Sequence, residues 1–157
     1  MNEVSIEDAY ARYADDLVRY ASLLVPRSWA ADVVADTFVD LLRNSDGAWS
    51  RVRDPKSFLF GAVANRARMH HRRNGRRVRR EHLVAAGRRP TRTVTEDAPE
   101  ELLTAFDELS IQQRAVTYLT YWHDMSVAQV AEALGVRDGT VRRQLARARE
   151  RLRGVLA

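Results

Sequence analysis

The chain has 157 residues, 45% of them hydrophobic and 30% charged, with no cysteine and a net charge of +5 at pH 7. This length allows one domain or two small ones, and the lack of cysteine excludes disulfides, thiolate metal sites and cysteine nucleophiles. The sequence contains no run of about 18 apolar residues, so it predicts no membrane span. The acidic N-terminus has no apolar signal core, so we expect a cytoplasmic protein with no membrane insertion.

The first half of the chain predicts helices throughout. Apolar residues recur at helical spacing over residues 10–24 and end at Pro26, which predicts the first helix, and a second helix is expected over residues 29–43. Turn-forming residues at 44–47 predict a loop, and residues 49–55 are expected to be irregular.

A third helix is expected from about Lys56, running into an arginine-rich block. The side chains expected to be buried in it are Phe58, Leu59, Ala62 and Val63. Residues 81–99 lose this periodicity and have the composition of a linker, after which helical spacing resumes. The sequence therefore predicts an all-α protein of two small helical domains, residues 1–80 and 100–157, joined by a flexible linker.

The charge is divided into blocks along the chain. Residues 64–92 hold eleven arginines and one glutamate, and residues 137–157 hold seven arginines and two acidic side chains. Residues 93–136, between these blocks, hold one arginine and eight acidic side chains. Two basic blocks separated by an acidic stretch predict two distinct contacts with nucleic acid rather than a general polycation.

The end of the chain predicts a helix-turn-helix. Ser126 and Gln129 form a capping-box pattern, Gly135 is placed to end the first helix, and Asp138 suits the positive end of the second. The second helix has one apolar stripe, consisting of Val141, Leu145, Ala148, Leu152 and Val155. A soluble terminal helix without a ligand is the simpler alternative.

The face of this second helix opposite its apolar stripe is basic. We expect Arg142, Arg143 and Arg147 to read duplex DNA in the major groove, because arginine matches both phosphates and guanine edges. Arg137 and Thr140 are expected near the DNA backbone. These five residues are the predicted contacts of the second domain.

Three aspartates, Asp32, Asp36 and Asp40, are spaced by four residues and so share one face of the second predicted helix. Like charges at this spacing repel, so the stripe costs helix stability unless a basic partner covers it. A docking face for a basic protein and a solvated helix face are both compatible with this pattern.

No catalytic constellation is present in the sequence. It lacks a glycine-rich phosphate loop, a Gly-x-Ser-x-Gly motif and a carboxylate pair in a plausible pocket. His70 and His71 are adjacent and therefore point to different faces of a helix, which makes a poor metal site. We expect no enzyme activity, no cofactor and no metal.

Three stretches, in order, resemble the extracytoplasmic-function (ECF) class of bacterial RNA polymerase sigma factors. Residues 29–42 resemble the core-binding helix of that class, and residues 57–68 resemble the segment that joins its promoter-melting and minus-ten regions. Residues 106–116 with the helix-turn-helix resemble its minus-thirty-five-reading domain. The resemblance implies a dissociable promoter-specificity subunit that binds the clamp helices and flap of core RNA polymerase, promoter DNA and an anti-sigma factor.

The resemblance also implies roles for residues of the first domain. Asp32, Asp36 and Asp40 would dock on the clamp helices. Trp49 lies where the family keeps an aromatic near a flipped minus-ten base, and Asn65 is an amide that reads a base edge, although Trp49 fits a core plug as well. The side chains expected to hold phosphates around the melted DNA are Arg66, Arg68, Arg72 and Arg73.

Two other classes of protein share some of these features. A free-standing helix-turn-helix regulator is the main alternative, but residues 1–63 show neither a sustained heptad nor a ligand pocket, and the basic block at 66–80 would have no role. An antagonist that mimics a sigma domain is the second alternative. The presence of both arginine sets argues against it.

Overall fold

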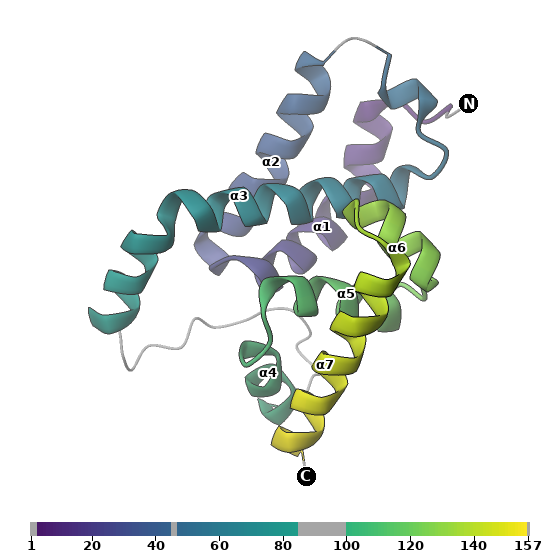
Figure 1. Ribbon diagram of the computed structural model, residues 1–157. Helices are drawn as coiled ribbons and strands as arrows, with labels where there is room; N and C mark the ends of the chain where they lie inside the picture. Colours follow the sequence, from purple (N-terminus) through teal and green to yellow (C-terminus); the bar gives the residue numbers. More distant parts are fainter. Residues whose placement is uncertain (1–2, 45–46, 85–99, 157) are drawn as a thin grey trace.

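The described residues of the computed structural model form α-helices and one 3-10 turn (Figure 1). The structure describes the backbone of residues 3–44, 47–84 and 100–156, and the side chains of the same residues apart from 73–84, 100–103 and 155–156. The described part contains no strand, which confirms the predicted all-α class. The elements are α1 (Ile6–Leu24), α2 (Arg27–Arg43), a 3-10 turn η1 (Trp49–Arg51), α3 (Pro55–Val84), α4 (Glu100–Asp107), α5 (Ile111–Tyr121), α6 (Val127–Leu134) and α7 (Asp138–Leu156).

The helix boundaries of the second unit follow the local sequence. Ser110 with Gln113 and Ser126 with Gln129 both form complete capping boxes. In the second of these, the Gln129 N–H donates to Ser126 Oγ at 3.1 Å and the Ser126 N–H donates to Gln129 Oε1 at 2.8 Å. Gly135 ends α6 with a φ of 66°, a left-handed conformation that glycine adopts without steric cost. The predicted helix-turn-helix is therefore present as α6 and α7.

The buried face of α3 differs from the prediction. Leu59 and Val63 are buried as expected, but Phe58 is 37% exposed and Ala62 is only half-buried. Phe60, which the sequence analysis did not select, is fully buried. Phe60 is buried because a second side of α3 is covered, by residues that come from the second unit. Its ring lies 4.4 Å, between centroids, from that of His123.

One continuous hydrophobic core joins the two units. Tyr20 of α1 lies at the junction: its ring is edge-on to Phe60 of α3, with centroids 5.0 Å apart, and stacks on Tyr118 of α5 at 5.3 Å. Helix α5 packs on α1, and α6 packs on the N-terminal part of α3, which crosses α1 and α2 (Figure 1). Of the residues expected to form the linker, 81–99, residues 81–84 instead belong to α3 and 85–99 lie outside the described residues. The two units on either side of this stretch are in contact.

His123 is half-buried at this junction. Its ring contacts those of Phe60 and Tyr118, and its Nε2 atom is buried with no hydrogen-bond partner in the part of the chain that the structure describes. Burial lowers the pKa of His123 below its usual 6.5, and Lys56 lowers it further, while Asp16 and Asp124 oppose the shift.

We therefore expect acid to weaken the folded structure through His123. A histidine with a depressed folded pKa stays neutral in the fold while the unfolded chain takes up a proton, so stability is full above about pH 6.5 and decreases as the pH falls through that value. The melting temperature should fall more between pH 7.5 and 5.5 in the natural chain than in His123→Gln. Identical pH slopes for the two proteins would contradict this role of His123.

Candidate nucleic-acid interface

Helix α7 has one buried apolar side and one exposed basic side. Val141, Leu145 and Ala148 of the predicted apolar stripe are buried and Leu152 is half-buried, while the side chain of Val155 lies outside the described residues. The first turn is closed by N–H groups of Thr140 and Val141, which donate to the Arg137 carbonyl at 3.0 and 3.2 Å. The side chains predicted to contact DNA lie on or next to this helix: Arg137, Arg142, Arg143 and Arg147 are exposed and Thr140 is half-buried.

Two contacts that the sequence analysis missed hold α7 in place. Arg149 donates from Nε to the hydroxyl of Tyr121 at 2.7 Å, with its guanidinium carbon 5.8 Å from the centre of that ring. Arg151 donates to the Glu108 carbonyl at 2.7 Å. These partners are 28 and 43 residues apart in sequence, so no local pattern indicates them. They fix the orientation of α7 relative to α5 and to the turn after α4.

The predicted minus-ten residues lie along α3 and include a small polar group. The Arg68 guanidinium donates to Asn65 Oδ1 and, at 3.1 Å, to Oε1 of Gln112 on α5. Asn65 and Arg72 are exposed. The side chain of Arg73 lies outside the described residues. Asn65 and Arg68 are thus held together on one helix, and Arg68 also contacts the second unit.

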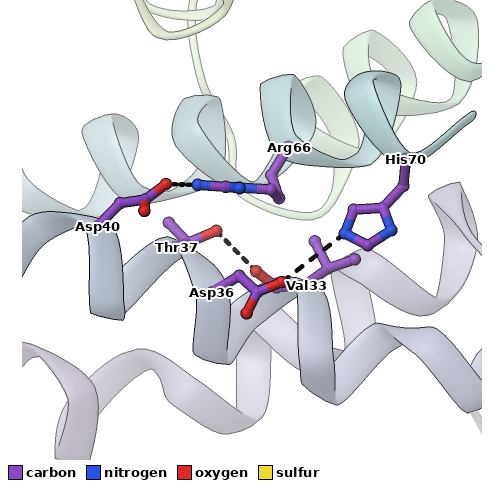
Figure 2. A network of polar contacts seen from close by, with 6 residues as sticks. All are labelled: Val33, Asp36, Thr37, Asp40, Arg66 and His70. Atoms are coloured by element: carbon purple, nitrogen blue, oxygen red, sulfur yellow. Dashed lines mark hydrogen bonds and ion pairs between the residues drawn. The ribbon is translucent and has the colours of Figure 1, made fainter. Parts of the chain in front are cut away.

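The acidic stripe of α2 faces the basic side of α3 (Figure 2). Arg66 forms an ion pair with Asp40, and His70 Nε2 lies 3.8 Å from the carboxylate of Asp36. Asp32 is exposed. The same chain therefore supplies a basic partner, Arg66, to one of the three members of this stripe, and places His70 beside a second. Because these pairs are partly exposed, each contributes little to stability.

Trp49 is half-buried beneath the loop that precedes α3. Its indole Nε1 donates to the Val4 carbonyl at 2.7 Å, and its ring is edge-on to Phe58 with centroids 5.9 Å apart. Both interactions hold the indole within the protein, as a core plug requires. Stacking on a DNA base stays a prediction.

Arg114 of α5 is a further residue that the sequence analysis did not select. Its Nε donates to the carbonyls of Phe106 and Leu109, both at 3.0 Å, and Nη2 donates to the Asp107 carbonyl at 3.1 Å. Its Nη1 donates to the Leu23 carbonyl, at the end of α1, at 3.0 Å. One guanidinium thus caps the C-terminal ends of helices from both units.

The described residues contain no group of three or more histidine, aspartate and glutamate side chains placed to hold a metal ion. They also contain no helix that is long and apolar enough to cross a membrane. The prominent surfaces of this fold are the exposed arginines of α7, the polar group on α3 and the charged pairs between α2 and α3.

The arrangement is that of a DNA-binding protein with two helical units. Residues 9–77 match the family described as Sigma-70 region 2, and residues 100–152 match Sigma-70, region 4. The RNA polymerase sigma-E factor of Streptomyces coelicolor is 32% identical, over 98% of this chain and 87% of that protein. The ECF RNA polymerase sigma factor SigL of Mycobacterium tuberculosis is 29% identical, over 87% of this chain and 80% of that protein.

Two solved structures have a similar fold. One is the sigma factor RpoE in complex with the anti-sigma factor NepR from Bartonella quintana, with a TM-score of 0.72 and 23% identity over 96% of this chain and 95% of that one. The other is CnrH in complex with the cytosolic domain of CnrY, with a TM-score of 0.64 and 26% identity over 99% and 89% of the two chains.

The chain belongs to the ECF class of RNA polymerase sigma factors. Proteins of this class are regulatory subunits of RNA polymerase that direct transcription initiation, and are not themselves enzymes. A free-standing helix-turn-helix regulator is not favoured, because both sigma regions are matched in order on one chain.

Proposed function

We propose that three helices divide the contacts of this sigma factor: α7 reads the minus-thirty-five element, α3 holds the melted minus-ten region, and α2 docks on core RNA polymerase. The observation that carries the proposal is the separation of two basic surfaces onto two units, each part of a matched sigma region. The protein acts in the cytoplasm, where the polymerase transcribes.

The role of α7 is supported by its exposed arginines and its fixed orientation. A helix with one buried face and arginines on the other fits the major groove, where bidentate contacts distinguish guanine. Arg142, Arg143 and Arg147 are assigned to base edges and phosphates. Arg137 and Thr140, at the start of the helix, are assigned to the DNA backbone.

The role of α3 is supported by the placement of its polar side chains. Asn65 is exposed and next to Arg68, so an amide and a guanidinium lie within reach of one nucleotide. Arg66, Arg68, Arg72 and Arg73 are assigned to phosphates around the opened strands. Trp49 is assigned to the same region, with its indole N–H already bonded to Val4.

The role of α2 is supported by the combination of charge and exposed apolar surface. Val39 is 40% exposed and Leu42 is 56% exposed, on the helix that also carries Asp32, Asp36 and Asp40. Apolar side chains surrounded by charge are typical of a protein-binding face. The partners assigned to the protein are the clamp helices and flap of core polymerase and, by analogy with its structural neighbours, an anti-sigma factor.

The direct test is run-off transcription by the host's core RNA polymerase on sheared genomic DNA, with and without this protein. We expect new discrete start sites whose upstream sequences share two elements. The same preparation should retain core polymerase in a pull-down. Failure of both assays would contradict the assignment of this protein to promoter selection.

Replacing the arginines of α7 should have two kinds of effect on promoter binding, one on sequence preference and one on salt dependence. Arg143→Ala is expected to weaken promoter binding by the holoenzyme by about 1–3 kcal/mol and to relax the preference at one base pair. Arg137→Ala should lower the salt slope of binding by about 1 without changing sequence preference.

The measurement is promoter affinity over a range of salt concentrations on single-base promoter variants. Arg19→Ala is the control, since Arg19 is an exposed arginine of α1 that faces Asp16 at 3.5 Å. It should change neither quantity. An equal loss of affinity for all three variants would contradict the assigned contacts.

A further inference from the structure

The side chains in the middle of α3 contact three neighbouring helices. Arg66 and His70 face the acidic stripe of α2 (Figure 2). Arg68 donates to Oε1 of Gln112 on α5 at 3.1 Å. His71 donates from Nε2 to a main-chain carbonyl at the end of α1 at 2.8 Å. These contacts occupy all but one side of this part of the helix.

Three exposed side chains, Asn65, Met69 and Arg72, share the remaining side, which we call the exposed face of α3. Their spacing by four and three residues places them within about 60° of one another around the helix. Further toward the N-terminus of α3 the same side is covered by α6, where a Cβ atom added to Gly61 would overlap the Ala133 carbonyl. The exposed face therefore begins after this contact and contains an amide, a thioether and a guanidinium.

Met69 is the apolar member of the exposed face and is 44% exposed. A single exposed apolar side chain is common on protein surfaces and needs no explanation by itself. The position of Met69 is what distinguishes it. It lies one turn from Asn65, about 6 Å along the helix axis, and before Arg72. A DNA strand that contacts both Asn65 and Arg72 must therefore pass over Met69.

The chemistry of the thioether limits what it can recognise on such a strand. Arginines hold phosphates and an amide hydrogen-bonds to a base edge, but a methionine side chain offers mainly apolar surface. The apolar group that base edges present is the C5-methyl group of thymine. The unbranched, polarisable methionine side chain also adapts its shape to a small apolar partner.

We propose that Met69 contacts the C5-methyl group of a thymine in the minus-ten element and so favours thymine beside the base that Asn65 reads. The proposal rests on the proposed function of α3 and adds one determinant of sequence preference to it. Met69 is already exposed in the free protein, so the contact needs no rearrangement of α3.

Deoxyuridine tests this contact, because it differs from thymidine only by the missing methyl group. The experiment uses holoenzyme and a promoter identified by run-off transcription, with each minus-ten thymine replaced in turn by deoxyuridine. For the natural chain, we expect one replacement to weaken promoter binding about fourfold, the factor for losing one buried methyl group. Met69→Ala should bind the thymine and deoxyuridine promoters equally at that position.

Two further variants separate a DNA contact from a structural role. Met69→Leu keeps an apolar side chain and should retain most of the preference for thymine. Arg19→Ala, on the exposed surface of α1, should retain all of it. The melting temperature of Met69→Ala should equal that of the natural chain, because an exposed side chain contributes little to the core.

The proposal would be overturned by a minus-ten element in which no thymine methyl affects binding, or by Met69→Ala retaining the fourfold preference. A lower melting temperature for Met69→Ala would assign Met69 to the fold instead of to DNA. Failure of the proposed function is distinguishable from these outcomes: the natural chain would then give no transcript with core polymerase, which would overturn both proposals.

Discussion

Tyr20→Ala is expected to lower the free energy of unfolding by about 3–5 kcal/mol, the range for removing a large aromatic side chain from a packed core. Tyr20 is fully buried and contacts rings from both other sides of the junction, Phe60 of α3 and Tyr118 of α5. Removing its ring leaves a cavity that two helices line. Chemical denaturation monitored by circular dichroism measures the loss.

Tyr20→Phe separates the ring from its hydroxyl. The Tyr20 hydroxyl is buried with no hydrogen-bond partner among the described residues, and this burial raises the pKa of Tyr20 far above its usual value. An unsatisfied buried polar group costs about 1–3 kcal/mol, so its removal should be neutral or stabilising. A loss from Tyr20→Phe as large as that from Tyr20→Ala would show that the hydroxyl, not the ring, supports the junction.

Arg114→Ala is expected to destabilise the protein by about 2–4 kcal/mol, because charge-assisted hydrogen bonds contribute more than neutral ones and the carbonyl of Leu23 would lose this donor. The acceptors are carbonyls at the ends of α4 and α1, two helices whose last turns contain no basic residue. The same denaturation assay measures the effect.

Arg114→Lys is the informative companion. Lysine keeps the charge but has a single ammonium group in place of the planar fork that reaches carbonyls in several directions. We expect a stability between those of the natural chain and Arg114→Ala. If lysine restored full stability, charge at the helix ends, rather than the forked geometry, would be the stabilising feature.

The local features of this fold could be predicted because they depend on neighbours in sequence. Helical spacing located the first two helices, and the Ser126–Gln129 and Ser110–Gln113 pairs marked helix starts that the structure confirms. Gly135 was recognised because a left-handed residue must end α6. The predicted apolar stripe of α7 is buried at Val141, Leu145 and Ala148.

Contacts between the units could not be predicted in the same way. A periodic stripe shows that a side is buried but not what covers it, so the second buried side of α3, at Phe60 and Gly61, was missed. Arg114 was overlooked because an arginine on a helix is usually solvated, and its acceptors come from two segments, the end of α1 and residues 106–109. The close approach of Gly61 to α6 depends on backbone positions that no spacing rule contains.

For the acidic stripe, the need for a basic partner could be predicted but the identity of that partner could not. Repulsion among Asp32, Asp36 and Asp40 indicated that a basic partner was needed, but the repulsion does not identify the partner. Arg66 supplies it to Asp40 from α3, and His70 lies beside Asp36. Asp36 is assigned to polymerase and Arg66 to DNA. The two residues lie on helices α2 and α3, whose charged sides face each other in the fold.

If α2 binds polymerase and α3 binds DNA as proposed, the Arg66–Asp40 ion pair couples the two binding events. A polymerase group that takes the Asp40 carboxylate competes with Arg66, and a DNA phosphate that takes Arg66 competes with Asp40. The first ligand to bind must break the Arg66–Asp40 ion pair, which costs free energy. The second ligand then binds a side chain that is already free of its partner. Such cooperativity is reciprocal by necessity, so under these assignments promoter DNA would raise the affinity for polymerase by the same factor as polymerase raises the affinity for DNA.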